Sequence, residues 1–414
     1  MFRKLLTLDQ AKQVIEHHFS AEPLGVEEIP LLEAYDRVLA QNVTAALDIP
    51  PFNRSTVDGY AVKAEDTFGA EENKPVKLKV CGTVNAGETP RITVKQRTVV
   101  GIVTGAPLPE GADAVVMLED ADQKDTDIYI QSPVTRDENV MKAGTDIRKG
   151  ETVLKKGQLL SSREIGVLAA VGWARVKVYA LPRVAVLSTG AEIIEPGKEL
   201  PPAKVYDINA YSLSAAVQES GGKPVYLGVF PDDMVEMQGI LKKALASADA
   251  IVTSGGVSVG PKDIMPKTLD SLGKPGVIIC GISIKPGKPA TVASIDGKPV
   301  FSLPGHPASA LLVFSLLVRP VIQSMAGRKA DSMLKVNACA STRMFPAKGR
   351  RTFIMVKLKR EKSGRLIAEP VPTGLSGAIT TLAKADGFVE IPENQQFVDE
   401  DDEVAVQLFK IYLP

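Results

Sequence analysis

The stretches that decide the fold are Arg183-Val-Ala-Val-Leu-Ser-Thr-Gly-Ala-Glu192 and Ala250-Ile-Val-Thr-Ser-Gly-Gly-Val-Ser-Val-Gly260. Each begins with a continuous apolar run and ends in a polar turn that contains glycine, which is typical of a buried parallel strand. Further apolar strands alternate with amphipathic helices. We therefore expect an α/β domain whose parallel-type sheet carries helices on both faces. The further predicted elements are strands over 224–230 and 300–303 and helices over 212–219 and 234–246.

The composition of the chain narrows the classes of partner. Its 414 residues exceed what one hydrophobic core usually serves, so we expect several domains. Lysine and arginine together number 49 and are balanced by 49 acidic residues. Without a basic excess, the chain is not expected to bind nucleic acid or an anionic membrane surface. An acidic ligand must instead be held by local geometry.

The sequence also predicts a cytoplasmic protein. Its longest apolar runs, such as residues 308–318, are shorter than the roughly 20 residues that span a bilayer. The N-terminal segment lacks the apolar stretch and the cleavage site of a signal peptide. Three widely spaced cysteines, Cys81, Cys280 and Cys339, match neither a disulfide framework nor a zinc pattern. Reduced thiols in the cytosol are the simplest interpretation.

The segments on either side of the α/β region are predicted to be rich in short strands. Between 62 and 140, strands separated by glycine, proline and asparagine indicate a small all-β domain, and the tail over 331–414 has the same character. A helix over 8–19, with a capping box formed by Thr7 and Gln10, is expected to pack on the domain formed by the following segment. The other predicted elements are strands over 76–80, 91–94, 99–103, 114–117, 128–130, 352–359, 366–370, 387–391 and 403–409, and a helix over 161–171.

Three turns after the predicted α/β strands have the composition of a binding site. Residues 254–260 include three glycines and two serines, which lets several backbone N–H groups point at one anion such as a phosphate. Lys285-Pro-Gly-Lys-Pro289 presents two ammonium groups on a stiff turn, suited to a tetrahedral oxyanion, although a solvated lysine loop is the alternative. Leu303-Pro-Gly-His-Pro-Ala-Ser309 either turns its amides toward a ligand or begins a helix with Ser309 near the cap. Ligands bind beyond the carboxyl ends of parallel strands, where these turns lie.

Carboxylates follow the same strands. Glu192, Asp232, Asp233 and Asp263 lie just after the first two strands and after the glycine-rich turn. Three carboxylates that converge on one sheet edge need a cation to balance their repulsion. Oxygen ligands without paired histidine or cysteine favour Mg²⁺ over zinc. The alternative for Asp232 is a helix N-cap.

A competing interpretation is a serine enzyme like the α/β-hydrolases. Gly256-Val-Ser-Val-Gly260 has the G-x-S-x-G pattern of a nucleophile elbow, and Asp263 and His306 follow Ser258 in the order of the catalytic residues. This interpretation leaves the two lysines, the other carboxylates and the β domains without a role. An aspartate so close to the serine would also lie on the helix that leaves the elbow and not on a later strand end.

Taken together, these segments resemble the molybdopterin molybdenumtransferases, the family of the prokaryotic MoeA proteins and of the E domain of gephyrin and its plant relatives. The matching segments follow the family's order and cover about residues 5 to 400, so the joint match is specific although each segment is short. They are residues 51–61, 104–116, 144–148, 187–192, 254–260, 285–289 and 303–309.

The resemblance implies a four-domain protomer that forms a homodimer. Its domains would be a discontinuous base over 1–45 and 141–178, an inserted β lid over 46–140, an α/β molybdopterin-binding domain over 179–328 and a C-terminal β barrel over 329–414. In the family, the lid of one chain faces the last two domains of the other. Residues of the lid can therefore belong to the site.

The resemblance also assigns roles to individual residues. Asp58 and Thr104, which by themselves read as a hairpin turn and a strand-end hydroxyl, become site residues of the lid. Arg350 matches a basic site position of the barrel, Ser376 lies near a family serine, and His306 stands where many members carry asparagine. The implied catalytic residues are Asp58, Thr104, Glu192, Asp263, Lys285, Lys288 and Arg350. Cofactor binding is implied for Ser188, Thr189, Gly190, Ser254, Gly255, Gly256, Ser258, Gly260, Pro304, Gly305, His306, Pro307 and Ser309, and metal binding for Glu192, Asp232 and Asp263.

The implied reaction inserts molybdate into the dithiolene of adenylated molybdopterin and releases AMP, as the final step of molybdenum-cofactor synthesis. The resemblance implies Mg²⁺ as cofactor and a molybdopterin adenylyltransferase as the donor of substrate, and it requires no protein nucleophile. The alternatives are a homologue that uses tungstate and a non-catalytic scaffold, since the gephyrin relative clusters receptors through the same fold.

Overall fold

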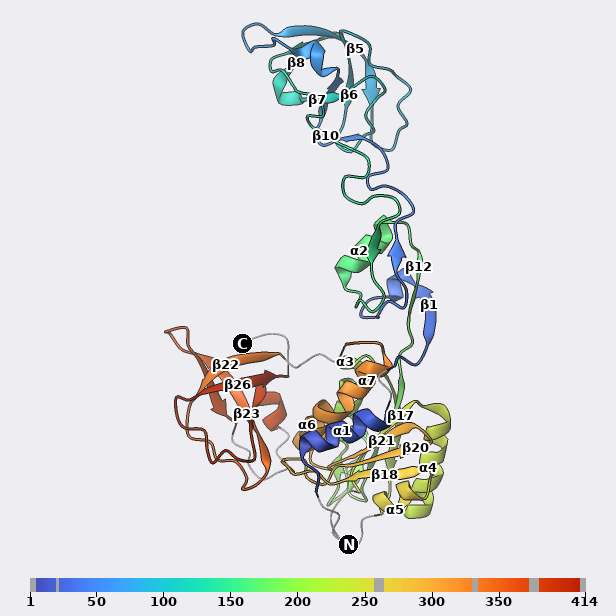
Figure 1. The fold of residues 1–414 in the computed structure, drawn as a ribbon, viewed down its shortest axis with the longest axis vertical. Helices are drawn as coiled ribbons and strands as arrows, with labels where there is room; N and C mark the ends of the chain where they lie inside the picture. The colour runs from blue at the N-terminus through green and yellow to red at the C-terminus, as the bar shows by residue number, and fades with distance from the viewer. Residues whose placement is uncertain (1–4, 20–21, 257–263, 330–333, 372–379, 410–414) are drawn as a thin grey trace. The chain divides into compact units, whose positions relative to one another are not determined.

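The computed structural model describes residues 5–19, 22–256, 264–329, 334–371 and 380–409 (Figure 1). The chain divides into two compact units. The first comprises residues 1–27, 36–38 and 178–414, and the second comprises residues 28–35 and 39–177.

The centre of the first unit is a six-stranded sheet with the strand order β16-β13-β17-β21-β20-β18 (Figure 1). The first four of these strands run parallel, which confirms the predicted parallel-type sheet. β20 and β18 add an antiparallel edge that the sequence analysis did not predict. Asp296 and Gly297, both at positive φ, form the tight turn between β20 and β21. The bounds are β13 Arg183–Thr189, β16 Lys223–Phe230, β17 Ala250–Ser254, β18 Pro275–Cys280, β20 Thr291–Ile295 and β21 Lys298–Leu303.

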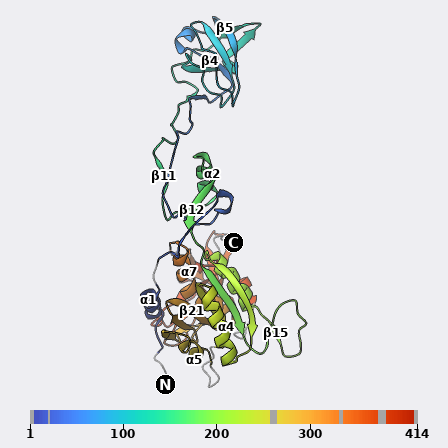
Figure 2. The same ribbon diagram turned by 90° about the vertical axis from the view of Figure 1, so that its right-hand side faces the viewer.

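Helices cover both faces of this sheet, as predicted (Figure 2). Val184 and Val186 of β13 belong to one buried cluster, whereas Ala185 and Leu187 belong to another, because successive strand residues point to opposite faces. The first cluster contains residues of α1, α3, α6, η4 and α7, and the second contains residues of α4 and α5. The bounds are α1 Leu8–His18, α3 Asn209–Glu219, α4 Met234–Ser247, α5 Met265–Asp270, α6 Pro307–Val313, η4 Phe314–Val318 and α7 Arg319–Met325.

The N-terminal helix α1 packs on a different surface from the one predicted. Its capping box is present, because the Gln10 N–H donates to the Thr7 hydroxyl at 3.2 Å and the Thr7 N–H donates to the Gln10 side chain at 3.0 Å. The apolar stripe of Leu8, Ala11 and Ile15 is buried with residues of β13 and β21. The prediction that α1 packs on the segment following it is therefore wrong. Helical periodicity identifies the apolar face of a helix but not the surface that covers it.

The elements α6, η4 and α7 form one continuous helical stretch of 19 residues, Pro307–Met325. With a mean hydropathy of 1.6, it is the one helix in the described residues that is long and apolar enough to cross a membrane. The predicted apolar run over 308–318 underestimated its length. However, 67% of its apolar window is buried inside the molecule. Packing in the core that it shares with α1 accounts for this composition.

The C-terminal part of the first unit is a closed β barrel, as predicted. β23 pairs with β24 on one side and with β25 on the other, so the order β23-β24-β22-β26-β25 returns to its first strand. β19 (Ile284–Lys285) adds to β23 in parallel. Val356, Val389 and Val406 belong to the apolar cluster of the barrel. The bounds are β22 Lys335–Ala340, β23 Arg351–Arg360, β24 Leu366–Pro370, α8 Thr380–Lys384, β25 Gly387–Ile391 and β26 Glu403–Leu408.

The second unit is built around a six-stranded sheet with the order β7-β4-β6-β5-β9-β8 (Figure 1). Val99 and Val100 of β6 belong to two different apolar clusters, so both faces of this sheet are buried. The described residues 91–94 form no strand, although one was predicted there. Ile92 and Val94 pack in a cluster of the sheet, so their alternation reflects side-chain burial without strand pairing. The bounds are β4 Gly59–Val62, β5 Val76–Val84, β6 Thr98–Ile102, β7 Ala114–Met117, β8 Ala121–Lys124 and β9 Asp127–Ile130.

Shorter elements complete the described chain. The predicted helix over 161–171 is α2 (Ser162–Ala170), which begins with a capping box between Ser161 and Glu164. The Ser161 hydroxyl and N–H donate to Glu164 and hold the pKa of its carboxyl below the ordinary value. The division of the chain into a base and a lid stays a prediction. The two-stranded sheets pair β1 Val26–Pro30 with β12 Arg175–Tyr179, β2 Val43–Thr44 with β11 Thr152–Leu154, and β3 Arg54–Ser55 with β10 Val140–Met141; the short helices are η1 Leu31–Glu33, η2 Ala64–Thr67 and η3 Leu118–Asp120.

Candidate functional site

The candidate site is a cavity at one edge of the α/β sheet. β13, β17 and β21 are neighbouring parallel strands, so their carboxyl ends meet at this edge. Ser188 pairs with Ser254, and Ser254 pairs with Leu303. The segments that leave these strands line a cavity of about 550 Å³. Open α/β sheets bind their ligands at this position.

The cavity brings together most of the residues predicted to bind the cofactor. They belong to the last residues of β13 and β17 and to the turns that follow β13, β17 and β21, and Asp232, after β16, joins them. Ser258 and Gly260 lie outside the described residues, and Ser309 is buried on α6 and is not among the described residues that line the cavity. The predicted residues that line it are Ser188, Thr189, Gly190, Glu192, Asp232, Ser254, Gly255, Gly256, Pro304, Gly305, His306 and Pro307.

A second group of lining residues was missed by the sequence analysis. Most of this group comes from the segment between β13 and α3. There β14 (Ile193–Ile194) pairs in parallel with β15 (Val205–Tyr206). This pairing returns residues 205–209 to the end of β13. The available signal was the polar pair of Asp207 and Asn209 shortly before the helix predicted over 212–219, a pattern that is typical of ordinary capping. The missed residues are Ile193, Val205, Tyr206, Asp207, Ile208, Asn209 and Pro289.

Glycine is required at position 255, where two of the turns approach each other. Gly255 has a φ of +98°, a conformation that L side chains rarely adopt. A Cβ atom added there would lie 2.2 Å from the carbonyl oxygen of Thr189. The absence of a side chain therefore allows the ends of β13 and β17 to form one wall of the cavity.

The buried amide of Asn209 ties the turns together. Its Nδ2 donates to Ser254 Oγ and to the carbonyl oxygen of Gly305, both at 2.7 Å. The Ser254 hydroxyl in turn donates to the carbonyl oxygen of Pro304 at 3.2 Å. These bonds hold the start of α3 against the ends of β17 and β21.

The buried carboxylate of Asp207 makes the equivalent connection to β13. Its Oδ1 accepts a hydrogen bond from the Ser188 hydroxyl at 2.8 Å and another from the Ala210 N–H at 3.1 Å. Asp207 is only 3% exposed. It therefore adds a buried carboxylate to the cavity lining, besides those of Glu192 and Asp232.

The structure separates the roles of the two neighbouring aspartates after β16. Asp233 is the N-cap of α4, and its Oδ1 accepts the N–H groups of Val235 and Glu236 at 3.0 and 2.9 Å. Asp232 lines the cavity instead, and its Oδ1 would lie 3.6 Å from a Cβ atom added to Gly256. The capping alternative considered for Asp232 thus belongs to its neighbour.

The predicted metal ligands are described only in part. Glu192 and Asp232 line the same cavity, whereas Asp263 lies outside the described residues. Within the described ranges, no three His, Cys, Asp or Glu side chains form a group that could hold a metal ion. The set of three ligands therefore stays a prediction. Ser258 and Asp263 of the serine-enzyme alternative also lie outside the described residues, whereas His306 lines the cavity.

The predicted lysine turn adjoins the cavity through Pro289, which lines it. Lys285 is exposed and Lys288 is half-buried, and neither is among the described residues that line the cavity. Gly287 has a φ of +109°, and a Cβ atom there would lie 2.5 Å from Val313. The turn that carries both ammonium groups is therefore packed tightly against α6.

Strand pairing brings the segment that carries Arg350 next to β19, where the lysine turn begins. Lys285 of β19 is in register with Thr352 of β23. The Ser283 hydroxyl donates to the carbonyl oxygen of Gly349 at 3.5 Å, and the carbonyl oxygen of Arg350 accepts the Thr352 hydroxyl at 3.1 Å. The three predicted basic residues thus come from two adjacent segments of the chain.

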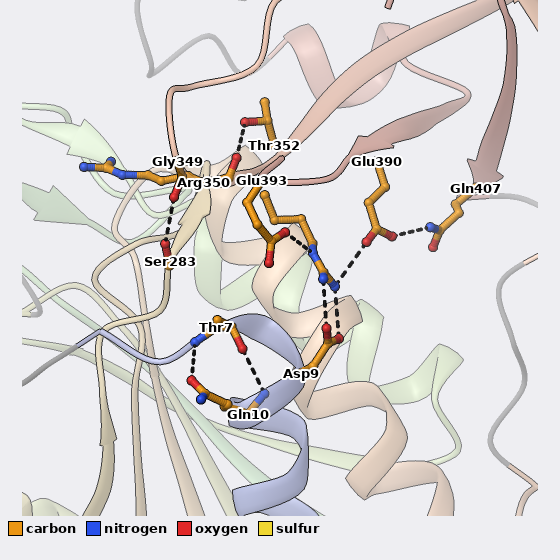
Figure 3. A network of polar contacts seen from close by, with 11 residues as sticks. Thr7, Asp9, Gln10, Ser283, Gly349, Arg350, Thr352, Glu390, Glu393 and Gln407 are labelled. Carbon is orange, nitrogen blue, oxygen red and sulfur yellow. Dashed lines mark hydrogen bonds and ion pairs between the residues drawn. The ribbon is translucent and has the colours of Figure 1, made fainter. Parts of the chain in front are cut away.

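The residue after Arg350 connects the barrel to α1 (Figure 3). The Arg351 side chain is 16% exposed and donates two hydrogen bonds to the Asp9 carboxylate, at 3.0 and 2.8 Å. It also donates to Glu393 at 3.0 Å and lies 3.4 Å from Glu390. The hydrogen bonds with Asp9 raise the pKa of Arg351, and those with Arg351 lower the pKa of Asp9. The pair is 342 positions apart, so no local sequence pattern indicated it.

In the second unit, the two predicted lid residues contact each other. Asp58 Oδ1 accepts the Thr104 N–H at 2.6 Å and the Thr104 hydroxyl at 2.9 Å. These two hydrogen bonds hold the pKa of the Asp58 carboxyl below its ordinary value, and the bond from the backbone N–H has the larger effect. Asp58 precedes β4 and Thr104 follows β6, its antiparallel neighbour. Both side chains are exposed, and their part in catalysis stays a prediction.

Known proteins share this sequence organisation. The MoeA N-terminal region (domain I and II) matches residues 6–172, a probable molybdopterin binding domain matches residues 185–324, and the MoeA C-terminal region (domain IV) matches residues 337–409. A molybdopterin molybdenumtransferase from Mycobacterium tuberculosis is 35% identical over 88% of this chain and 91% of its own length. The chain belongs to the MoeA family of molybdopterin molybdenumtransferases.

Other MoeA relatives extend the match to the whole chain. The molybdopterin molybdenumtransferase of Bacillus subtilis is 32% identical, with 93% of this chain and 90% of the relative covered. The crystal structure of a molybdopterin biosynthesis MoeA protein from Pyrococcus horikosii superimposes with a TM-score of 0.84 and 42% identity. That comparison covers 99% of this chain and 100% of the other, so the MoeA fold extends over both units.

Proposed function

We propose that this protein inserts molybdate into the dithiolene of adenylated molybdopterin and releases AMP, as the final step of molybdenum-cofactor synthesis. The observation that carries the proposal is the cavity at the ends of β13, β17 and β21, which lies within the residues matched by the probable molybdopterin binding domain. Relatives that match most of the chain are named molybdopterin molybdenumtransferases. Family membership supports a transferase of molybdenum-cofactor synthesis, and the cavity supplies a place for its substrate.

The glycine turn after β17 would bind the phosphates of the substrate. Gly255 and Gly256 both have positive φ, a conformation in which successive N–H groups can line one concavity. Because the chain has no net charge, an anion must be held by such local groups and not by a long-range field.

The basic residues beside the cavity would bind molybdate. Lys285 and Lys288 stand on a turn packed against α6, and Arg350 lies in the adjacent segment of the barrel. An ammonium group is a compact charge that suits a tetrahedral oxyanion. In the reaction, the two dithiolene sulfurs give up their protons and replace two oxygens of molybdate, which leave as water after taking up these protons and two more from the solvent. One water adds across the phosphoanhydride between AMP and the terminal phosphate of the pterin, this bond breaks, and AMP leaves. The residues bind and orient the two substrates, and none acts as a nucleophile.

The acidic residues of the cavity would hold Mg²⁺. Glu192 and Asp232 line the cavity, and we assign Asp263 as the third ligand. A set of carboxylate oxygens suits Mg²⁺. When bound, the ion would supply positive charge at the phosphoanhydride.

The test measures AMP release and cofactor formation when purified protein is mixed with adenylated molybdopterin, molybdate and Mg²⁺. We expect AMP and the cofactor to form in equal amounts over time. Replacing molybdate with tungstate in the same assay measures which of the two oxyanions the protein prefers. Release of no AMP would reject the enzyme and favour the scaffold. Asp263→Asn should cut the rate sharply and alter its Mg²⁺ dependence, with Asp249→Asn, outside the cavity lining, as the matched control.

We further propose that the protein is a cytoplasmic homodimer that receives substrate from a molybdopterin adenylyltransferase and binds neither nucleic acid nor membrane. Asp58 and Thr104 would complete the site of the other subunit. Mixing inactive Asp58→Ala chains with inactive Asp263→Asn chains should restore one intact site per mixed dimer. Mixed dimers that form but stay inactive would reject a site shared between subunits.

A further inference from the structure

Three unpaired buried polar atoms belong to residues that line the candidate cavity. They are Thr189 Oγ1, Asp207 Oδ2 and Asn209 Oδ1. Throughout the described residues, only seven buried side-chain nitrogen or oxygen atoms lack a hydrogen-bond partner, so nearly half of them belong to this one cavity. An unpaired buried polar atom costs free energy. Their concentration at one cavity indicates where atoms of a ligand complete the pairing.

The hydrogen bonds of Asn209 determine which of its atoms is left for a ligand. Both N–H groups of Nδ2 are used, one by Ser254 Oγ and one by the carbonyl oxygen of Gly305. A flipped amide would turn its oxygen toward the Gly305 carbonyl oxygen, and the two acceptors would repel each other. Oδ1 is therefore the unpaired atom, and it can only accept.

The same reasoning applies to Asp207. Its Oδ1 already accepts from the Ser188 hydroxyl and the Ala210 N–H, whereas Oδ2 has no partner. Asp207 and Asn209 are 3% and 9% exposed. One short segment that lines the cavity thus carries two unpaired buried acceptors, two positions apart in the chain, and a ligand that pairs with both needs two donors.

We propose that Asp207 and Asn209 recognise the 2-amino group and the adjacent N3–H of the pterin ring. This assignment rests on the proposed function, which supplies two heterocycles, the pterin and the adenine of the AMP moiety. The pterin edge offers two adjacent donors. The 6-amino group of adenine adjoins the acceptor N1, which would repel one of the two oxygens. The acceptor pair therefore selects the pterin.

The rest of this segment suits a flat ring. Val205, Tyr206 and Ile193, which line the cavity beside the acceptor pair, offer apolar and aromatic surface. Tyr206 is 40% exposed and can therefore cover a ring that enters from the open side. Apolar contact with a few fixed polar groups is the usual composition of a site for a small molecule.

The test compares ligands that differ only at the proposed edge. Binding of 6-hydroxymethylpterin and of 6-hydroxymethyllumazine, in which an oxo group replaces the 2-amino group, is measured on the full chain in EDTA. The chelator removes metal coordination as a cause of any preference. We expect the wild-type protein to bind the pterin at least about tenfold more tightly. Asp207→Asn places a donor opposite the 2-amino group, so this preference should vanish or reverse.

The matched control is Thr253→Val. The Thr253 hydroxyl is buried and donates to Ser302 Oγ at 2.8 Å, and neither residue is among the described residues lining the cavity. Its loss should leave the preference unchanged. If Asp207→Asn does not fold, the wild-type ratio decides by itself, because equal binding of pterin and lumazine would overturn the proposal.

A parallel comparison of AMP with IMP distinguishes the two heterocycles, since IMP carries an oxo group in place of the 6-amino group. If Asp207→Asn abolishes a preference for AMP over IMP and leaves the preference for pterin over lumazine intact, the two acceptors bind adenine and the assignment to the pterin is wrong. A protein that transfers molybdate but does not distinguish pterin from lumazine would overturn this inference alone. A protein that binds the pterin selectively but releases no AMP would overturn the proposed function alone.

Discussion

The pair of Arg351 and Asp9 leads to a quantitative prediction about how firmly α1 is held. The two hydrogen bonds, at 3.0 and 2.8 Å, have the bidentate geometry that strengthens an ion pair. The Asp9 side chain is 63% exposed, so solvent screens the interaction, and exposed pairs contribute about 0.2–1 kcal/mol. The 16% exposure of Arg351 and the bidentate geometry favour the upper end. We expect a coupling free energy of about 1 kcal/mol.

The assay is a double-mutant cycle with Asp9→Asn and Arg351→Gln, singly and together. Asp9 also lies in the first turn of α1, where a carboxylate stabilises the helix, but this contribution is present with and without Arg351 and cancels in the cycle. The readout is hydrogen exchange of the α1 amides in the full chain. A coupling of about 1 kcal/mol corresponds to a roughly fivefold change in the opening equilibrium. A coupling near zero at neutral pH would refute the reasoning.

The pH dependence of this coupling provides a second test. The hydrogen bonds from Arg351 lower the pKa of Asp9 in the folded protein below its ordinary value of 3.8. A group whose pKa is lowered on folding stabilises the folded state fully above its unfolded pKa, and this contribution is lost as the pH falls through the folded pKa. The coupling should therefore be constant from neutral to mildly acidic pH and shrink below pH 3.8. A coupling that grows on acidification would contradict the assignment.

Three further perturbations test the site. Lys288→Ala should raise the molybdate concentration for half-maximal rate about ten- to hundredfold, because one charge-assisted contact is worth about 1.5–3 kcal/mol, and it should change pterin affinity less. An unchanged molybdate requirement would show that Lys288 does not bind molybdate. Thr104→Val removes one of the two hydrogen bonds to Asp58 and keeps the backbone bond, so carbon NMR titration should find the lowered pKa of Asp58 shifted part of the way back up; an unmoved pKa would contradict this. Gly255→Ala combines positive φ with a Cβ atom 2.2 Å from a carbonyl oxygen and should cost about 3 kcal/mol or more of unfolding free energy in urea. The control Gly297→Ala, at a φ of +83° with nothing within 4 Å, should cost only about 1–2 kcal/mol, and equal losses would show that the close approach is unimportant.

The sequence by itself determined the central strands and the three turns of the cavity. β13 and β17 were predictable because a strand buried on both faces has no polar position in its middle. The turns were predictable because their glycines, prolines and hydroxyls are consecutive in the chain, so the pattern and the structure are local. The family resemblance then joined them into one site, since the order of the segments is itself sequence information.

The roles of Asp232 and Asp233 could not be distinguished from the local sequence. Either residue can cap a helix, and both precede α4 in the sequence. Asp233 accepts two N–H groups of the first turn, and this capping leaves Asp232 on the side of the cavity. The choice depends on the path of the chain between β16 and α4, which differs by one residue between the two outcomes and has no separate signature in composition.

Only the tertiary structure decided which surface covers α1 and that residues 205–209 line the cavity. Any sufficiently apolar surface can cover an amphipathic helix, so periodicity cannot distinguish the α/β core from the following segment. Asp207 and Asn209 join the site because β15 pairs with β14 and returns the chain to the end of β13. Arg351 reaches Asp9 because β19 pairs with β23, and because Leu6, just before α1, forms a bridge with Ile282, just before β19. Each of these contacts joins residues that are distant in sequence. Because the packing of whole elements determines such contacts, the local sequence around either residue does not predict them.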